Sequence, residues 1–391
     1  MADIISGFGT GMSFIGCNLF VLNYDKRNVS VGLMMMVVLL SGFLINPIAG
    51  TIADKLNRRN ILIISNTLRA VVLILVALSI RLEFFKMSFM FILAATSGIG
   101  WTVTYPASRG LAQEILPPSE YVNGNSLIET GTQIGLFCAA GACGIIYETY
   151  GLFAILLIDA LTFLISNIFL FKIDYNPATV LDESQSYFNM FINGWEFLNR
   201  RPLILWYGVF MNVTAIAIMS INVVLPGYVS YHLNAGPLVF GFSDMLYGIG
   251  ACTAGLVVAV LIQKYRSTRL LSASFFTISI SSLLFLVINK WIVGLYISFF
   301  FLGYSISSLR IIMNTKIMEF VPKSHMGRSQ SVWMAFTTLM QIVSVYGIGI
   351  LMDVISVRVG FLSLACIILV GFTGFLVLTQ ISDLNLEKMK S

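Results

Sequence analysis

Residues 50–59 read Gly-Thr-Ile-Ala-Asp-Lys-Leu-Asn-Arg-Arg, and they separate two long apolar runs at 30–53 and 58–80. Gly50 allows a neighbouring helix to approach closely, and Asp54 can end one helix and cap the N-terminus of another. Basic residues hold such a loop on the cytoplasmic side of a membrane. An ordinary positively charged loop is the alternative interpretation, but spacing this specific favours a functional loop between two membrane helices.

The alternation of apolar runs and short polar breaks continues along all 391 residues. Apolar residues make up 58% of the chain, and only 10% are charged, whereas soluble domains carry about a quarter charged residues. The mean hydropathy is +0.90. The runs long enough to cross a bilayer lie at about 4–24, 30–53, 58–80, 88–108, 125–147, 150–172, 203–229, 237–263, 269–289, 291–312, 329–352 and 358–379. Because lipid leaves no partner for an unpaired backbone group, the sequence predicts an all-α membrane protein with about twelve transmembrane helices.

The longest polar break, Asp174 to Pro202, divides the runs into two sets of six. Leu116-Pro117 and Val321-Pro322 recur at one constant offset, which Gly144 and Gly349 share, and such a repeat is typical of two pseudo-symmetric halves. We therefore predict an N-terminal six-helix bundle at 1–173, a cytoplasmic linker at 174–202 and a C-terminal six-helix bundle at 203–391. Within the linker, Tyr187 to Leu198 places its apolar residues at helical spacing, which predicts an amphipathic helix on the inner membrane surface.

The basic residues gather in alternate loops, so the positive-inside rule predicts that both termini are cytoplasmic. The net charge of +5 reflects this distribution and does not indicate a nucleic-acid partner. The five cysteines fall inside apolar runs without metal-ligand or disulfide spacing. No phosphate-binding loop and no catalytic constellation is visible, which predicts neither a cofactor nor an enzyme. No basic segment precedes the first run, so we expect no cleavable signal peptide.

The loop at 50–59 resembles the signature G-x-x-x-D-R/K-x-x-R-R of the major facilitator superfamily, and the likeness spans essentially the whole chain. The segments Ile64 to Ala70, Pro106 to Pro118 and Asp159 to Ser166 are similar to those of its drug-and-siderophore exporter branch, which includes macrolide efflux pumps and the enterobactin exporter. The resemblance implies the major facilitator fold and alternating access to a site near mid-membrane. It also implies that the loop acts as a conformational-switch motif with these residues: Gly50, Asp54, Lys55, Arg58 and Arg59.

Four charged residues lie a turn or more inside the apolar runs, where a charge costs about 2.5–3.5 kcal/mol at a helix centre and so needs a reason. Arg69 and Asp159 both lie near mid-depth, and we predict that they pair, either as a structural lock or with a role in transport. Glu129 and Asp244 have no obvious basic partner along the sequence. A carboxyl in such surroundings readily takes up a proton, so Glu129, Asp159 and Asp244 are candidates for proton coupling, with a hydrogen-bonded structural role as the alternative.

In the resembling family the first, fourth, seventh and tenth membrane helices line the central cavity. In this sequence they offer polar and aromatic side chains that suit an amphipathic ligand, although some could equally form interhelical hydrogen bonds. These candidates are Asn18, Asn23, Trp101, Thr104, Tyr105, Asn212, Asn222, Tyr304 and Ser308. Arg310 can contact an anionic substrate or anchor its helix at the membrane surface.

These observations together predict a monomeric secondary transporter in a bacterial inner membrane. It would export a small amphipathic molecule such as a drug, a siderophore or another metabolite. The exchange would be proton antiport with rocker-switch alternating access, in which the two halves move around the central site. A proton-coupled importer of the same fold is one alternative, and a non-transporting membrane sensor or lipid-handling protein is another.

Overall fold

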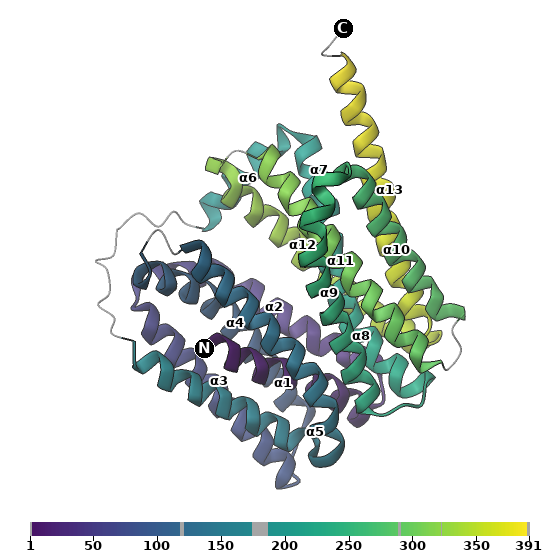
Figure 1. The fold of residues 1–391 in the computed structure, drawn as a ribbon. Coiled ribbons are helices and arrows are strands. Elements are labelled where there is room, and N and C mark those ends of the chain that lie inside the picture. Colours follow the sequence, from purple (N-terminus) through teal and green to yellow (C-terminus); the bar gives the residue numbers. More distant parts are fainter. Residues whose placement is uncertain (1, 118–120, 174–186, 288–290, 322, 389–391) are drawn as a thin grey trace. The chain divides into compact units, whose positions relative to one another are not determined.

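The structure is a computed structural model that describes residues 2–117, 121–173, 187–287, 291–321 and 323–388. Some side chains within the helices lie outside that description, among them those of Gly50, Asp54, Lys55 and Glu129. Every regular element of the described residues is helical (Figure 1). The elements are α1 (Ala2–Asp25), α2 (Asn28–Lys55), α3 (Arg58–Arg81), α4 (Met87–Ile115), α5 (Tyr121–Phe171), α6 (Tyr187–Asn199), α7 (Pro202–Met211), α8 (Val213–Gly227), the π-helix η2 (Tyr228–His232), α9 (Pro237–Lys264), α10 (Ser267–Val287), α11 (Ile292–Phe320), α12 (Lys323–Val354) and α13 (Val359–Lys388).

Eleven segments of the described chain are long and apolar enough to cross a membrane, and the one at Ile134–Phe171 is 38 residues long. That segment contains two helices, because Gly151 interrupts it with φ of +69° and ψ of −171°. The predicted runs at 125–147 and 150–172 correspond to its two parts. The all-α membrane fold with about twelve spans is therefore confirmed.

Two predicted boundaries were wrong in an informative way. The predicted run at 88–108 continues as α4 to Ile115, because polar residues beyond 108 find partners while the helix goes on. The helix stops one residue short of Leu116, whose extended backbone is the conformation that a following proline favours. The predicted run at 203–229 is divided into α7 and α8 at Asn212, and it ends in the π-helix η2.

The chain divides into two compact units. One comprises residues 1–187 with 235–245, and the other comprises 188–234 with 246–391, so the division passes through α9. Independent movement of halves at 1–173 and 203–391 stays a prediction. The predicted helix at Tyr187 to Leu198 exists as α6, and its Gly194 packs against the backbone of Arg328 on α12 within the second unit.

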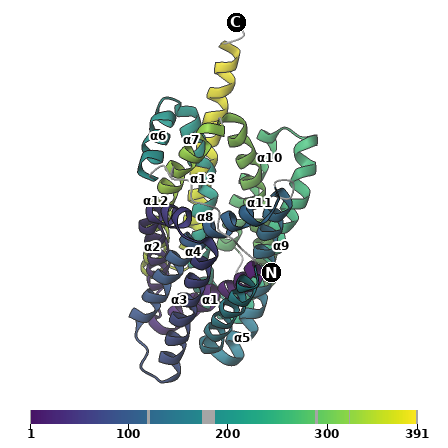
Figure 2. The ribbon, with the colours of Figure 1, turned by 90° about the vertical axis from the view of Figure 1, so that its left-hand side faces the viewer.

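Helix α3 exposes apolar side chains on its outer face and buries polar side chains among apolar ones on its inner face. Its surface carries Ile64, Leu68 and Leu75, each 59% exposed, along one face. Helix α3 packs against α4 and α5 (Figure 2). Its opposite face buries Asn66 and Arg69. A water-soluble helix would place these groups the other way round. The arrangement suits a helix whose outer face meets lipid, where burying leucine between helices brings no hydrophobic gain.

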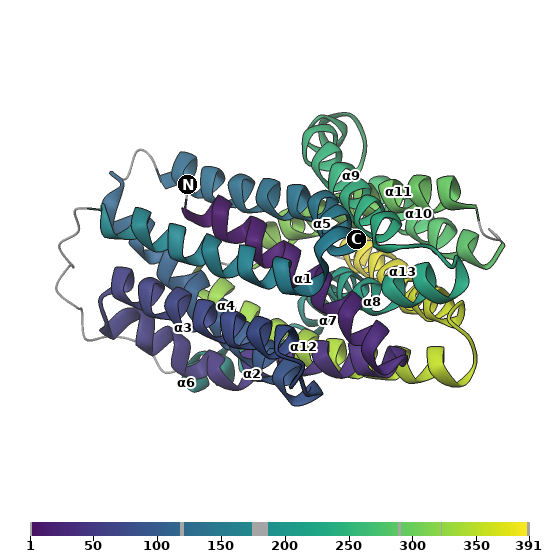
Figure 3. The ribbon, with the colours of Figure 1, turned by 90° about the horizontal axis from the view of Figure 1, so that it is seen from below.

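Helix α1 packs along both parts of α5 through its glycines (Figure 3). From Gly7 to Gly11 it meets successive turns of the first part, beginning at Thr132 and reaching Ala139. From Gly9 to Gly16 it meets the second part in the reverse direction, from Asp159 back to Leu152. The two parts of α5 therefore run antiparallel, and the residue that reverses the chain between them is the left-handed glycine at 151.

The second unit is held by aromatic packing and by polar contacts between helices. Phe285 stacks on Phe361 with ring centroids 3.8 Å apart, and Tyr228 meets both rings edge-on. Trp333 of α12 lies over Gly208 and donates its indole N–H to the Leu205 carbonyl at 3.1 Å. The aromatic contacts connect η2, α10 and α13, and the Trp333 contacts join α12 to α7. Helix α8 packs against α12 and α13 in the same bundle.

Candidate functional site

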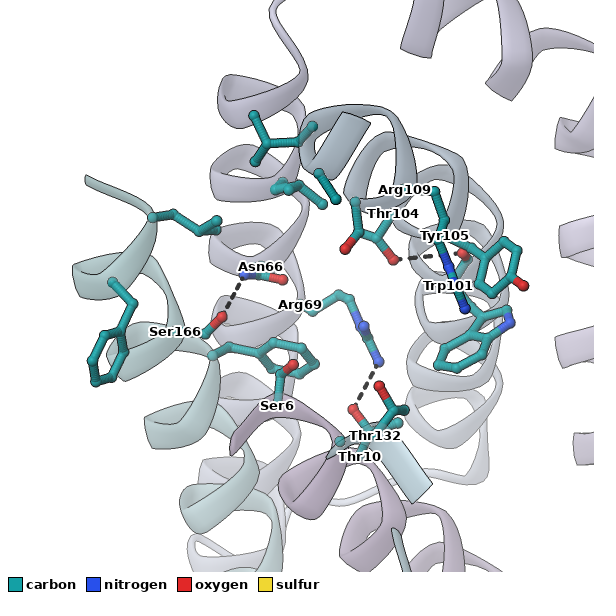
Figure 4. A pocket seen from close by; sticks show the side chains of 18 of the residues that line it. Ser6, Thr10, Asn66, Arg69, Trp101, Thr104, Tyr105, Arg109, Thr132 and Ser166 are labelled. Carbon is teal, nitrogen blue, oxygen red and sulfur yellow. Dashed lines mark hydrogen bonds between the residues drawn. The ribbon is translucent and has the colours of Figure 1, made fainter. Parts of the chain in front are cut away.

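The first unit contains a cavity of about 490 Å³ enclosed by α1, α3, α4 and both parts of α5 (Figure 4). Hydroxyl, amide and guanidinium groups share its wall with aromatic rings and branched aliphatic side chains. Its lining residues are Ser6, Gly7, Thr10, Leu62, Asn66, Arg69, Trp101, Thr104, Tyr105, Ser108, Arg109, Leu111, Ala112, Ile115, Thr132, Leu136, Phe163, Ser166, Phe169, Leu170 and Ile173. A small number of polar groups set among apolar ones is the composition of a small-molecule site.

Arg69 is the charged group most deeply set in this wall, with 7% of its surface exposed. Its Nη2 donates to Thr10 Oγ1 at 3.4 Å, and its Cζ lies 4.2 Å from the centroid of the Phe163 ring. The side chain crosses α4 at Gly100, where an added Cβ would lie 2.6 Å from Arg69 Cδ. The glycine therefore provides the space through which the guanidinium reaches the cavity.

Asp159 lies behind Arg69 and outside the cavity lining. It is 2% exposed, and it faces Gly9 of α1 and accepts a hydrogen bond from Thr162 Oγ1 at 3.4 Å. The Arg69 and Asp159 charges interact electrostatically, but no hydrogen bond or ion pair joins these two described side chains. The direct pair that we predicted is not formed in this structure, because Arg69 turns toward Thr10 and Phe163 while Asp159 faces α1.

A ladder of side-chain hydrogen bonds joins α3 to the second part of α5 beside Arg69. Asn66 Nδ2 donates to Asn167 Oδ1 at 3.0 Å and to Ser166 Oγ at 3.4 Å. Asn167 Nδ2 in turn donates to Thr67 Oγ1 at 3.0 Å. These bonds hold α3, which carries Arg69, against the second part of α5.

The opposite wall is one face of α4. Trp101, Tyr105 and Arg109 follow one another at intervals of four residues, so they lie above one another on the helix. The Arg109 Cζ lies 5.3 Å from the centroid of the Tyr105 ring, and the rings of Trp101 and Tyr105 are 6.2 Å apart. This wall offers flat surfaces and a second positive charge to a ligand.

The motif at 50–59 covers the end of α2, the two-residue connection of Leu56 and Asn57, and the start of α3. Arg58 Nη1 lies 3.3 Å from Glu114 Oε1 on α4, and Arg59 Nη1 donates to the Ile173 carbonyl at 3.0 Å. The Asn57 side chain accepts from the Asn60 backbone N–H at 3.1 Å and caps α3. Two residues of the predicted switch motif are therefore tied to the ends of α4 and α5. The side chains of the other three, Gly50, Asp54 and Lys55, lie outside the described residues.

Of the predicted cavity residues, Trp101, Thr104 and Tyr105 line the cavity, and Arg69 joins them. Asn18 is fully buried in the helix packing, and Asn23 is exposed. Asn212, Asn222 and Ser308 donate to carbonyls of their own turn at 2.8, 3.0 and 2.7 Å. Tyr304 and Ser308 border a smaller cavity of about 100 Å³ in the second unit, and Arg310 is exposed. The structure thus gathers only some of the candidates at the larger cavity.

The other proton-coupling candidates lie on α5 and α9. Asp244 is partly buried on the part of α9 that belongs to the first unit, where Gly241 packs against the Ala140 carbonyl of α5. Glu129 lies on α5, with its side chain outside the described residues. Their roles in coupling stay proposals.

Several lining residues were missed from the sequence. Arg109 was assigned to a loop, although its spacing of four from Tyr105 was a signal that the helix face continued. Asn66 and Phe163 stood inside segments noted only for their family likeness. Thr10 and Thr132 carried no sequence signal, because one hydroxyl in an apolar helix more often bonds its own backbone.

Comparison with known proteins agrees with this architecture. The family model described as the Major Facilitator Superfamily matches residues 4–225 and 210–388. An MFS-type transporter of Bacillus subtilis (strain 168), YfiS, itself uncharacterized, is 22% identical over 388 residues, which cover 94% of this chain and 89% of YfiS.

Two solved structures share the fold. The crystal structure of the nucleoside transporter NupG superposes with a TM-score of 0.79 at 15% identity, covering 97% of each chain. A bacterial homologue of the iron transporter ferroportin in an inward-facing state superposes with a TM-score of 0.75 at 14% identity, covering 96% of each chain. With helices that span a membrane, a polar cavity among them and a family match over nearly its whole length, this chain belongs to the Major Facilitator Superfamily of membrane transporters.

Proposed function

We propose that the protein is a secondary active transporter that exports a small amphipathic molecule in exchange for protons. The cavity between α3 and α4 carries this proposal, because its aromatic rings, aliphatic side chains and hydrogen-bonding groups suit a ligand with both apolar and polar parts. Alternating access would open the site to each side of the membrane in turn. Proton uptake by Asp159, Asp244 or Glu129 would then bias which side is open.

The chain would act as a monomer in a bacterial inner membrane, with both termini in the cytoplasm. The basic residues of the loop at 50–59 and of the segment at 264–269 support this orientation. Labelling of single cysteines introduced at exposed Leu56 and Leu82, at opposite ends of α3, in a variant whose five native cysteines are replaced by alanine, would test it in intact cells. We expect an impermeant maleimide to label only the cysteine at position 82.

Proteoliposomes with an imposed pH gradient test the transport itself. Erythromycin, enterobactin and ethidium would be added in turn while an internal pH dye reports proton movement. We expect at least one compound to speed proton movement, and Asp244→Asn or Glu129→Gln to abolish that effect in a folded protein. Movement of the compound opposite to the protons identifies an antiporter, whereas movement with the protons identifies an importer. If no compound moves with or against protons, proton coupling is wrong.

A further inference from the structure

The described lining of the first unit's cavity is positively charged. Among the described residues that line it, the charged ones are Arg69 and Arg109, and no acidic side chain joins them. A charge removed from water is costly unless it is paired or well hydrogen-bonded. We propose that this cavity binds an organic anion, in which a carboxylate, sulfonate or phosphate group is attached to an apolar body. The proposal deepens the transport function above and rests on it for the statement that the anion is carried.

Arg69 is the group that would hold the acid. Among the residues that the structure describes, the partners that touch its guanidinium are neutral, namely a threonine hydroxyl at 3.4 Å and the face of the Phe163 ring at 4.2 Å. The nearby carboxylate of Asp159 influences it electrostatically without bonding to it, and it lies outside the cavity lining. A ligand acid group entering the cavity would add charge-assisted hydrogen bonds to this guanidinium.

The rest of the cavity indicates the shape of the ligand. Leu62 lies seven residues before Arg69 on α3, which at ~1.5 Å per residue places it about 10 Å along the helix axis. Around Leu62 lie Leu111 and Leu170, which form one apolar cluster across α3, α4 and α5. The ligand would therefore direct its acid group toward Arg69 and its apolar body toward this cluster.

The α4 wall fits the same orientation. Trp101 and Tyr105 offer flat faces beside the path between the two ends, and Arg109 adds a second cation near the apolar cluster (Figure 4). The ion pair of Arg58 and Glu114 marks one end of α3 and α4. Arg109 lies five residues from Glu114 on α4, whereas Arg69 lies eleven residues from Arg58 on α3. The two arginines thus lie at different depths from that end, so an anion that enters from it would meet Arg109 before Arg69.

Two probes of nearly equal size and different charge test the proposal directly. Naphthalene-2-sulfonate is anionic, and naphthalene-2-sulfonamide is its neutral counterpart. Binding of each to the full chain in phosphatidylcholine nanodiscs would be measured by calorimetry, with empty nanodiscs as the reference for partition into lipid. We expect the sulfonate to bind at least about tenfold more tightly, as charge-assisted hydrogen bonds to a guanidinium imply.

Variants assign that preference to the arginines. Arg69→Gln should bring the two affinities close to equal, and Arg69→Lys should keep part of the preference. Arg109→Gln should lower the preference by about threefold, since it removes the charge that lies nearer the apolar cluster. Arg81→Gln, an exposed arginine at the far end of the same helix, should leave it unchanged. A ratio of affinities measured within one variant does not depend on how much of that protein is folded.

A lipid headgroup could supply the same acid chemistry as a dissolved ligand. Repeating the titration with phosphatidylglycerol in the nanodiscs distinguishes the two sources. Unchanged sulfonate binding assigns the site to a dissolved anion, as we expect. If phosphatidylglycerol weakens sulfonate binding to the unaltered protein but not to Arg69→Gln, the site binds a lipid phosphate. That result would overturn the proposal of a dissolved ligand.

Other outcomes overturn the anion site itself. Equal affinity of the two probes for the unaltered protein would do so, as would an equal effect of Arg69→Gln and Arg81→Gln. The transport proposal fails separately. If only neutral or cationic compounds drive proton exchange, the anion proposal is wrong and the transport proposal stands. If the sulfonate binds but no compound drives proton exchange, the anion site stands and proton-coupled export is wrong.

Discussion

Arg58 Nη1 lies 3.3 Å from Glu114 Oε1, so the first residue of α3 is tied to the last turn of α4. Gly110 makes room for this contact, because a Cβ there would lie 2.5 Å from Arg58 Cζ. Both ends of the pair are about one-fifth exposed, with side-chain exposures of 22% and 21%. This contact thus holds the first turn of α3 and the last turn of α4 together, and both helices line the cavity.

The energy of this contact is open to measurement by a double-mutant cycle of Arg58→Gln and Glu114→Gln. We expect a coupling energy of about 0.2–1 kcal/mol, the range of partly exposed ion pairs. Unfolding in a mixed-micelle titration would give it, and the value should fall as salt is raised. Strictly additive single effects would show that the two side chains do not support each other.

Gly9 should tolerate no larger residue. A Cβ at this position would meet Thr162 Oγ1 and lie 2.5 Å from Asp159 Oδ1, so α1 would have to move away from α5. We expect Gly9→Ala to destabilise the protein by about 1–3 kcal/mol through overpacking. Gly255→Ala is the matched control, because nothing lies within 4 Å of a Cβ there and the substitution should be neutral or stabilising. Equal melting temperatures for the two variants would contradict the close packing of α1.

The asparagine ladder between α3 and α5 should be measurably cooperative. Asn66→Ala and Asn167→Ala each remove the bond of 3.0 Å between the two amides, so their combined cost should be less than the sum. Hydrogen bonds between membrane helices are worth about 0.6 kcal/mol on average, and we expect coupling of that size. Thr149→Ala removes a hydroxyl that bonds only within its own turn, and with Asn66→Ala it should be additive. Additivity of the asparagine pair would mean that the ladder does not act as a unit.

Asp159→Asn should strengthen anion binding in the cavity. Its carboxylate interacts with Arg69 from behind the wall, so its removal leaves more of the positive potential for a ligand. We expect the sulfonate probe to bind about three- to tenfold more tightly, equal to roughly 0.7–1.4 kcal/mol, while the neutral sulfonamide is unaffected. Titration calorimetry of both probes would check this. Weaker binding of both probes would instead give Asp159 a purely structural role.

The fold was predictable because one physical requirement decides it. A segment in lipid must bond its own backbone, so run length and polar breaks were enough to place the spans. The end of α4 was missed because Arg109 and Glu114 look like a loop until their partners are known. Arg109 lies against Tyr105, and Glu114 is paired with Arg58.

The site was only partly predictable, for a related reason. Lipid and bundle interior are equally apolar, so the apolar pattern does not show which face of a membrane helix points inward. Arg69 was found because a mid-membrane charge must be accommodated somewhere. Thr10 and Phe163 were not found, because their importance comes from where α1 and α5 place them beside that charge.

The left-handed turn at Gly151 has a consequence for how the protein is made. Since the chain reverses there without an additional loop, the spans on either side of it would enter the bilayer together as one helical hairpin. Both arms of that hairpin pack on α1, which leaves the ribosome before either of them. The first span is therefore already synthesised when the two helices that pack against it emerge.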